Sequence, residues 1–235
     1  MSCEGQSCCS CPGRPSEWSA LTAPEFEVLT KGIRARIFHP GESLYLQGNR
    51  CEGIHCLQWG LIGIRRVDQA GESALLRLAR GGDVLGYNAL LLDGVYLESA
   101  EVLATSKICF IGKWLILPML RGNADLTHAF LRRALTDMTR LEEEYANLLT
   151  RTLKSRLLRL LVSLHRQISA PASADASSFE LPIQRKELAA LLGATPESVS
   201  RVIGRLNAEG AVRIKERQVE IRDPDRAMNG ALYEG

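Results

Sequence analysis

Four cysteines lie within the first eleven residues of the chain, where their thiols could bind a metal or exchange disulfides. They are Cys3, Cys8, Cys9 and Cys11, and Cys8 and Cys11 form a C-x2-C pattern. The surrounding sequence, CEGQSCCSCPG, is too rich in Gly, Ser and Pro to form a helix or a strand. Clustered cysteines in a reducing compartment bind metal or sense redox state more often than they form structural disulfides, and the chain's total of seven is odd. The segment therefore indicates metal binding or redox chemistry.

A second set of reactive side chains lies near the other end of the chain. Glu197, Ser200 and Arg201 are spaced i, i+3 and i+4, so they would project from one face of a helix. An arginine can pair with guanine in the DNA major groove through two hydrogen bonds, and a carboxylate can accept one from cytosine N4. The residues that we expect to contact DNA are Glu197, Ser200, Arg201, Arg205, Arg185 and Thr195.

Two short helices would position these side chains. The first, over Gln184–Leu192, would end at Gly193, because glycine readily takes the left-handed conformation of a helix end. The second would begin at Pro196, with Thr195 as its N-cap, and would stop at Gly210. A helix, a short turn and a second helix form the helix-turn-helix pattern of DNA-binding proteins.

The segment VRIKERQVEIRD that follows predicts a small hairpin, or wing, with Lys215–Gln218 at its tip. A solvated helix face, with Glu197 and Arg201 as an ordinary ion pair, is the alternative for the outer residues. We favour DNA binding because the turn, the N-cap and the wing all fall in register with that face.

A long amphipathic helix is predicted ahead of these elements. Gly and Pro are absent from Asn123 until Pro171, and apolar residues recur there in alternating steps of three and four. Charged residues flank a narrow apolar stripe, which favours a coiled coil of two chains over a helix packed only against its own domain. The residues of the predicted dimer seam are Leu131, Ala134, Met138, Leu141, Tyr145 and Leu148.

The remaining elements are predicted more coarsely. A helix over Thr152–Gln167 would be followed by a loop over Ile168–Ser178, which is rich in Pro, Ala and Ser. From Glu25 to Leu120, turn signals recur at spacings typical of an all-β barrel or sandwich, with one helical stretch at Pro24–Lys31.

The overall composition limits the classes of function. The chain has 235 residues, 46% hydrophobic and 24% charged, and its formal net charge of +2 identifies no partner. No apolar run approaches the ~20 residues of a membrane helix and no secretory signal begins the chain, so we expect a cytoplasmic protein. The sequence shows no plausible Ser/His/Asp set and no phosphate loop, so we do not expect an enzyme. A thiol oxidoreductase that uses the N-terminal cysteines is the alternative from that class.

After residue 20 the chain resembles the FNR/CRP family of bacterial transcription regulators. The strongest local match is PESVSRVIGRL (Pro196–Leu206), whose E-x-x-S-R pattern is similar to that of the FNR branch. The resemblance implies an α+β fold with an N-terminal β-roll of the cyclic-nucleotide-binding jelly-roll type, a long dimerisation helix and a C-terminal winged helix-turn-helix. It implies a Cys-rich segment over 1–22, a β-roll sensor domain over 23–122, a dimerisation helix over 123–150 and a DNA-binding domain over 151–235.

The resemblance also implies how DNA would be read. Glu197, Ser200 and Arg201 would recognise a TTGAT half-site, and a homodimer would bind a double-stranded palindrome resembling TTGAT-N4-ATCAA. The two recognition helices would then address half-sites about 34–36 Å apart, one helical turn of DNA. RNA polymerase is the further partner that the resemblance implies.

For the cysteines, the resemblance implies a [4Fe–4S] cluster that responds to oxygen, nitric oxide or cellular redox state. TSKICFI (Thr105–Ile111) is similar to the stretch in which FNR-type oxygen sensors carry an internal cluster ligand. The family's third N-terminal cysteine is missing from PGRPSEW (Pro12–Trp18), so another cysteine would take its place. The implied thiolate ligands are Cys3, Cys8, Cys11 and Cys109, with Cys9 as the alternate.

Other interpretations of the cysteines stay open. A zinc ion also takes four thiolates, Cys8 and Cys11 could be oxidised directly, or the segment could bind nothing. The protein would then be a metal-free regulator controlled by cysteine oxidation or by a small-molecule effector in the β-roll. Cys51 and Cys56 are interpreted as small apolar residues, although either could replace a missing ligand.

The chain departs from the family pattern at three further positions. Tyr87 stands where members that bind cyclic AMP carry a glutamate, and Glu98 stands where they carry an arginine. A carboxylate repels a phosphate, so we do not expect a cyclic nucleotide. Leu141 replaces the seam aspartate that weakens the cluster-free dimer of the oxygen sensor, which predicts a dimer with or without the cluster.

Overall fold

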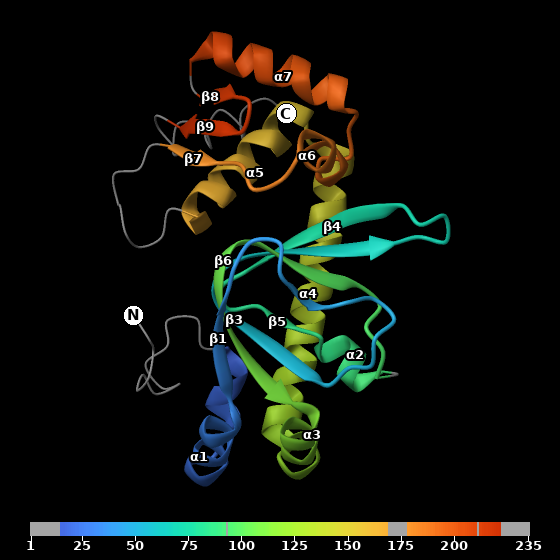
Figure 1. The fold of residues 1–235 in the computed structure, drawn as a ribbon, viewed down its shortest axis with the longest axis vertical. Helices are drawn as coiled ribbons and strands as arrows, with labels where there is room; N and C mark the ends of the chain where they lie inside the picture. The colour runs from blue at the N-terminus through green and yellow to red at the C-terminus, as the bar shows by residue number, and fades with distance from the viewer. Residues whose placement is uncertain (1–14, 93, 169–177, 211, 222–235) are drawn as a thin grey trace. The chain divides into compact units, whose positions relative to one another are not determined.

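The computed structural model describes residues 15–92, 94–168, 178–210 and 212–221. The chain forms two compact units, which are Met1–Ser73 with Arg77–Thr139, the N-terminal unit, and Ala74–Leu76 with Arg140–Gly235, the C-terminal unit. Figure 1 follows the elements along the chain in colour. Helix α4 (Ala124–Thr150) is the long helix predicted from Asn123 onward, and the division between the units falls within it.

The N-terminal unit is built on a six-stranded sheet of β-roll type, as predicted for this region. Strands β1, β6, β3 and β4 are neighbours in that order, β2 also pairs with β6, and β5 also pairs with β3. The strands are β1 (Arg34–Phe38), β2 (Ser43–Tyr45), β3 (Gly53–Val67), β4 (Ser73–Arg80), β5 (Val84–Leu85) and β6 (Ser99–Gly112).

Strands β3 and β6, with 15 and 14 residues, form the long antiparallel pair at the centre of this sheet. Their register shifts on both sides of Trp59, which marks an irregularity in the ladder. Gly60 follows with a φ of 113°, and a Cβ there would lie 2.6 Å from the Cα of Ser106. The two strands can therefore approach this closely only because residue 60 is a glycine.

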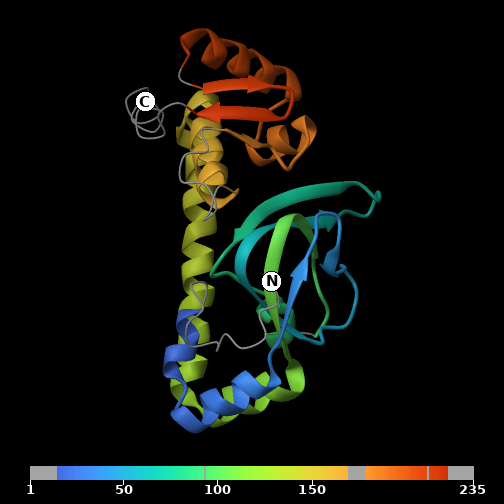
Figure 2. The same ribbon diagram turned by 60° about the vertical axis from the view of Figure 1, so that its left-hand side comes forward.

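Among the described residues of this unit, four short helical elements accompany the sheet: η2 (Ser16–Ala20), α1 (Ala23–Gly32), α2 (Tyr87–Leu91) and α3 (Lys113–Gly122). Helix α1 confirms the predicted helix, and the Glu25 carboxylate accepts a hydrogen bond from the Thr22 backbone N–H at 2.8 Å in a capping box. Helices α1 and α3 pack together, as both views show (Figures 1 and 2).

Helix α3 corrects the prediction that strands continue to Leu120. Its buried residues Leu115, Ile116 and Met119 occupy one helical face, whereas Trp114 is exposed. The run WLILPML is apolar on both faces, so its sequence does not show the helical period that the packing later selects.

The two faces of the sheet enter separate hydrophobic cores. One core joins the sheet to η2, α1, α3 and α4, and its members include Trp18, Ile54, Cys56, Cys109 and Phe130. The other includes Leu57, Ile62, Val102 and Ile108. Burying a large apolar side chain completely contributes about 1.5–3 kcal/mol relative to leaving it exposed, so these cores fix the sheet against its helices.

The C-terminal unit contains helices α5 (Leu153–Ile168), α6 (Arg185–Leu191) and α7 (Pro196–Glu209) and a three-stranded sheet. The sheet has the order β7-β9-β8, formed by β7 (Ser178–Glu180), β8 (Val212–Lys215) and β9 (Gln218–Ile221). Figure 2 shows it alongside α7. The predicted helices and wing are confirmed. Strand β7 was not predicted. The predicted loop over Ile168–Ser178 loses its first residue to α5 and its last residue to β7. Residues 169–177 of that loop lie outside the described ranges.

Candidate functional site

Helix α7 begins and ends where its sequence predicts. The Thr195 hydroxyl accepts a hydrogen bond from the Ser198 backbone N–H at 3.2 Å, and Pro196 occupies the first helical position. Gly210 closes the helix in the left-handed conformation, with a φ of 74°. The inner face packs into the unit through three buried side chains, Val199, Ile203 and Leu206.

The outer face of α7 carries the predicted DNA contacts. Glu197, Ser200, Arg201 and Arg205 are all exposed. Among the residues that the structure describes, neither arginine forms an ion pair, so their guanidinium groups are available to a ligand. The pKa of the Glu197 carboxyl is lowered, because the carboxylate accepts hydrogen bonds from the Glu197 backbone N–H and from the Thr195 hydroxyl. The nearby charge of Arg201 adds to this effect. Glu197 is therefore ionised at neutral pH and acts only as a hydrogen-bond acceptor.

Three local contacts hold α7 in place. The Lys154 ammonium on α5 pairs with the Glu209 carboxylate at 2.9 Å. The Asn207 side chain accepts from the Ile214 backbone N–H at 2.7 Å and donates to its carbonyl at 3.0 Å, which joins α7 to the wing. The exposed face is thus presented by a helix fixed at its C-terminal turn.

The first helix of the pair supplies the remaining predicted contact. Arg185 opens α6 and is half-buried, next to the N-cap residue Gln184. The Gln184 backbone N–H donates to the Glu187 carboxylate at 2.7 Å, as in a capping box. Exposed Lys186, Arg213 and Lys215 lie on α6 and the wing and add positive charge to this unit.

The predicted seam is an exposed apolar stripe along α4 within a single chain. Leu131, Met138, Leu141 and Tyr145 are 53–64% exposed. Leu135 and Leu149, which were not predicted, widen the stripe, and Ala134 is half-buried. Leu148 differs from the others because it is 37% exposed and its Cδ2 lies 3.2 Å from the position that a Cβ on Gly193 would take. Leu148 therefore packs in part against the turn between α6 and α7.

Of the predicted cluster ligands, the structure describes Cys109, whereas Cys3, Cys8, Cys9 and Cys11 lie outside the described residues. Cys109 is 4% exposed, and the Gln58 side-chain amide donates a hydrogen bond to its sulfur at 2.8 Å. Across residues 15–221, apart from the gaps, no three His, Cys, Asp or Glu side chains gather as a metal site. A cluster bound to Cys109 would take its other ligands from elsewhere in the chain.

The structure brings a second thiol beside Cys109. The register of β3 and β6 sets Cys56 directly opposite Cys109, so both side chains project from the same face of the sheet. Both belong to the buried core that contains Trp18. Sequence reasoning did not pair them, because residues this far apart in the chain meet only through the strand register.

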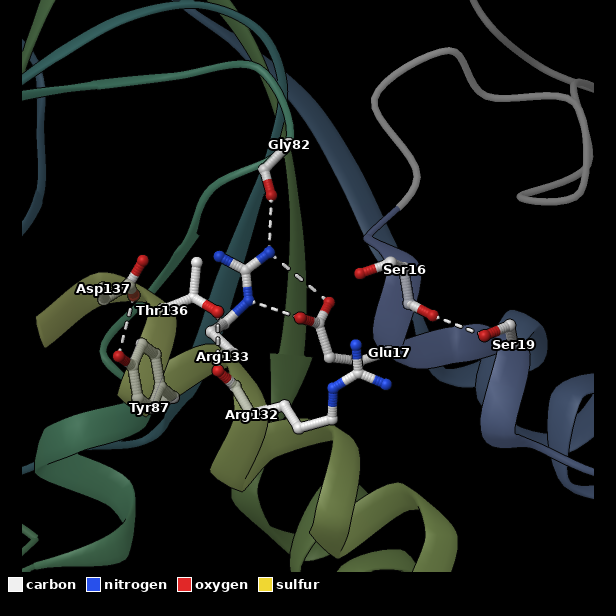
Figure 3. Close-up of polar contacts among 9 residues, drawn as sticks. All are labelled: Ser16, Glu17, Ser19, Gly82, Tyr87, Arg132, Arg133, Thr136 and Asp137. Carbon is white, nitrogen blue, oxygen red and sulfur yellow. Dashed lines mark hydrogen bonds and ion pairs between the residues drawn. The ribbon is translucent and has the colours of Figure 1, made fainter. Parts of the chain in front are cut away.

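A buried ion pair joins η2 to α4 (Figure 3). The Arg133 Nε donates to the Glu17 carboxylate at 2.6 Å, and its Nη2 donates to the Gly82 carbonyl at 2.8 Å. The Arg133 side chain is only 11% exposed and the Glu17 side chain only 4%. Burial alone would lower the pKa of Arg133, but the hydrogen bond and the charge of Glu17 raise it instead.

Tyr87, which stands where members that bind cyclic AMP carry a glutamate, forms a structural contact in this chain. The Tyr87 hydroxyl donates to the Asp137 carboxylate on α4 at 2.8 Å, one turn beyond Arg133 (Figure 3). Burial and this hydrogen bond raise the pKa of Tyr87, so the phenol stays protonated. Glu98, which stands where those members carry an arginine, is half-buried and directly precedes β6 in the sequence.

Comparisons with known proteins agree with this architecture. Residues 155–226 match the Crp-like helix-turn-helix domain family, and residues 35–123 match the cyclic nucleotide-binding domain family. An anaerobic regulatory protein of Bacillus subtilis is 26% identical over 204 residues, covering 86% of this chain and 85% of the relative. A cyclic AMP receptor protein of Thermus thermophilus is 28% identical over 210 residues, covering 86% and 90%.

The solved structure of FixK2 from Bradyrhizobium japonicum matches with a TM-score of 0.67 and 19% identity, covering 84% of this chain and 96% of that one. At that identity the likeness shows the fold. The names of the Bacillus subtilis and Thermus thermophilus relatives point to different signals, although the two proteins are nearly equally identical to this chain. Within the described residues, no helix combines the length and apolar character needed to cross a bilayer.

Proposed function

Because this chain belongs to the CRP/FNR family of DNA-binding transcription regulators, we propose that it acts as a homodimer whose DNA binding is controlled by a [4Fe–4S] cluster sensitive to oxygen, nitric oxide or redox state. In this regulator α7 would read the DNA sequence, α4 would form the dimer and Cys109 would bind the cluster.

Sequence readout is supported by the outer face of α7. Glu197 offers an acceptor to cytosine N4, Arg201 offers a bidentate donor to guanine, and Ser200 can contact a base or a phosphate. Lys186, Arg213 and Lys215 would contact phosphates, which strengthens binding without reading sequence. The proposed site is a palindrome resembling TTGAT-N4-ATCAA, with RNA polymerase as the further partner on DNA.

Fluorescence anisotropy with a labelled duplex tests this part. The TTGAT-N4-ATCAA duplex should bind more tightly than a scrambled duplex of the same composition at the same salt concentration. Equal affinity for the two duplexes would contradict sequence readout by this face.

Dimerisation is supported by the exposed stripe on α4. Leu131, Met138, Leu141 and Tyr145 recur at the a and d positions of a heptad pattern and stay exposed in one chain. A second copy of the same helix would cover them in a parallel coiled coil. The stripe contains no charged a or d residue, so we expect the dimer to form with or without the cluster.

Cluster binding is supported by the surroundings of Cys109. Its sulfur already accepts a hydrogen bond from Gln58, and hydrogen bonds of this kind tune iron–sulfur centres. Trp18, seven positions after Cys11 in the sequence, lies in the same core as Cys109. The short separation in sequence between Trp18 and Cys11 supports ligands from the cysteine segment. The ligands would be Cys109 with Cys3, Cys8 and Cys11, or Cys9 as the alternate. The cluster, when bound, supplies a centre that reacts with oxygen or nitric oxide.

The chain's own residues would carry the effect of that reaction to DNA binding. Gln58 orients the Cys109 sulfur, and the surrounding core keeps water away from it. Glu17 holds the segment that follows the cysteines against α4 through Arg133. Reorganisation of the cysteine segment would therefore act on the helix that forms the seam.

Visible absorbance with iron and sulfide analysis tests the cluster. Protein purified without oxygen should be brown, should contain about four iron and four sulfide per chain, and should lose its colour in air. Colourless protein without iron would contradict the cluster. Zinc analysis and thiol titration would then separate the remaining alternatives, and the DNA-binding test would stand unaffected.

A further inference from the structure

A cavity of about 430 Å³ lies in the N-terminal unit, within the range of small-molecule sites. Strands β1, β2, β3 and β6 contribute to its lining. Most of the wall is apolar or aromatic, including Phe38, Tyr96, Ile108 and Phe110. Neither Tyr87 nor Glu98 lines it, so it is not the position that the family resemblance assigns to a cyclic nucleotide.

Two buried polar atoms in this lining have no hydrogen-bond partner among the residues that the structure describes. They are the hydroxyl of Tyr45 and the Nδ1 of His55, on residues that are 6% and 7% exposed. The two rings lie 5.5 Å apart. A buried donor or acceptor without a partner costs free energy, and most such atoms in folded proteins are satisfied. This pair therefore points to a ligand that completes their hydrogen bonds.

The protonation states of the two groups define what they can bind. Burial lowers the pKa of His55 to about 4, so the imidazole is neutral at pH 7. Burial also raises the pKa of Tyr45, with the charge of Glu98 adding to it, so the phenol keeps its proton. A neutral imidazole and a phenol can each donate or accept, which suits a hydroxyl or carbonyl oxygen.

The strand register carries positive charge to the same face. Arg34 on β1 is opposite Phe110 on β6, and Phe110 is opposite His55 on β3, so the three side chains form one row. Arg50 also lines the cavity. Both arginines are exposed, so their positive charge lies on the solvent side of the cavity, which we call its mouth. His55 and Tyr45 are buried, so the two unpartnered atoms lie on its inner side.

The other charges at the mouth are already compensated. Arg36 pairs with Glu42 and stacks on Phe38, and Glu52 accepts from the Lys113 ammonium at 3.0 Å. In the part of the chain that the structure describes, Arg34 and Arg50 have no ion-pair partner. The mouth therefore keeps two uncompensated positive charges.

We propose that this cavity binds a small aromatic oxyanion, with its carboxylate or phosphate at Arg34 and Arg50, its ring between Phe110 and Tyr96, and a hydroxyl oxygen at Tyr45 and His55. The site does not involve the cysteines or α7, so it would give the protein a second input that can be measured without DNA.

Isothermal titration of the full chain with matched probes tests the ligand class. 4-Hydroxybenzoate should bind, and 4-hydroxybenzamide, which lacks the charge, should bind at least about tenfold more weakly. Benzoate, which lacks the hydroxyl, should also bind more weakly. 4-Hydroxyphenyl phosphate distinguishes phosphate from carboxylate as the preferred anion. Failure of all charged probes to bind at millimolar concentration, or equal binding of the acid and the amide, overturns the proposal.

Two sets of variants locate the site. R34Q and R50Q should each weaken 4-hydroxybenzoate about tenfold, whereas R66Q, an exposed arginine outside the cavity, should not. Y45F should weaken the probe by a similar factor without lowering the melting temperature, because it removes an unsatisfied hydroxyl. Y96F is the stability control, since the Tyr96 hydroxyl donates to the Gly53 carbonyl at 3.2 Å. Wild-type probe affinity in R34Q, R50Q and Y45F, or a melting temperature that falls in Y45F as far as in Y96F, overturns the assignment.

Discussion

Arg133 and Glu17 form an ion pair in the interior of the N-terminal unit, and this pair links the segment that follows the cysteines to helix α4. The Arg133 Nε lies 2.6 Å from the Glu17 carboxylate. Glu17 is six positions after Cys11, and Arg133 lies between Leu131 and Ala134, two residues of the proposed seam. If the cysteines bind the proposed cluster, this ion pair would connect the residues that follow them to the helix of the proposed seam.

Removing one partner of this pair should destabilise the N-terminal unit. R133M leaves the Glu17 carboxylate buried without its cation, a change that typically costs about 3–5 kcal/mol. Urea unfolding of R133M should show a loss of this size, and the double variant E17L/R133M should recover much of it. The neighbouring R132M removes an exposed arginine and should stay within about 0.5 kcal/mol of the wild type. Equal stability of R133M and R132M would show that the pair contributes little.

Replacing Arg201 should remove sequence preference without removing DNA binding. A bidentate arginine–guanine pair supplies about 1–3 kcal/mol of discrimination, so R201A should approach equal affinity for the proposed palindrome and a scrambled duplex. K186Q should weaken both duplexes by a similar factor and reduce the salt dependence, because it removes a proposed phosphate contact. Anisotropy titrations at several salt concentrations separate these results. A wild-type preference in R201A would place sequence readout elsewhere.

A charge in the seam should separate the dimer. L141D places a carboxylate where two apolar residues would meet, so light scattering should give the mass of one chain. E143A changes the opposite face of α4 and should keep the wild-type mass. Cluster-free wild-type protein should also scatter as a dimer. An L141D protein that keeps the dimer mass would exclude this stripe as the interface.

The two facing thiols should differ in their effect on iron. C109A removes the proposed internal ligand and should lower the iron and sulfide content of protein purified without oxygen. C56A removes a thiol from the same face of the same strand pair and should keep the wild-type content. The result would reverse if Cys56, rather than Cys109, were the ligand on the sheet. Cavity formation should cost each variant some stability, which makes them a matched pair.

Two glycine substitutions in the C-terminal unit should change stability in opposite directions. G193A places a Cβ in the left-handed region, at a φ of 56°, and 3.2 Å from Leu148, so it should lower stability by about 1–2 kcal/mol. G204A lies within α7, and among the described residues nothing beyond the adjoining helix backbone lies within 4 Å of its new Cβ, so it should raise stability by about 0.5–1 kcal/mol. Thermal unfolding measures both. Equal shifts would mean that the turn does not require glycine.

Local signals predicted the C-terminal unit well and the N-terminal unit in outline. Thr195, Pro196 and Gly210 mark the limits of α7 by their own chemistry, so its position could be predicted from a few residues. Helix α3 could not, because its apolar run has no visible period until the core selects a face. The Cys56–Cys109 pair depends on a register that shifts around Trp59, and no local pattern encodes it. The unpartnered atoms of Tyr45 and His55 likewise depend on how distant strands meet.

The burial of Trp18 gives the protein an intrinsic optical probe. Of the three tryptophans, Trp18 is 1% exposed, whereas Trp59 and Trp114 are 44% and 70% exposed. A W59F/W114F variant would therefore emit from a single indole held in the same core as Cys109. Its emission would be blue-shifted while that core is packed, and an absorbing centre bound nearby would shorten its excited-state lifetime. Time-resolved fluorescence could then follow assembly and loss of such a centre in real time, without an added label.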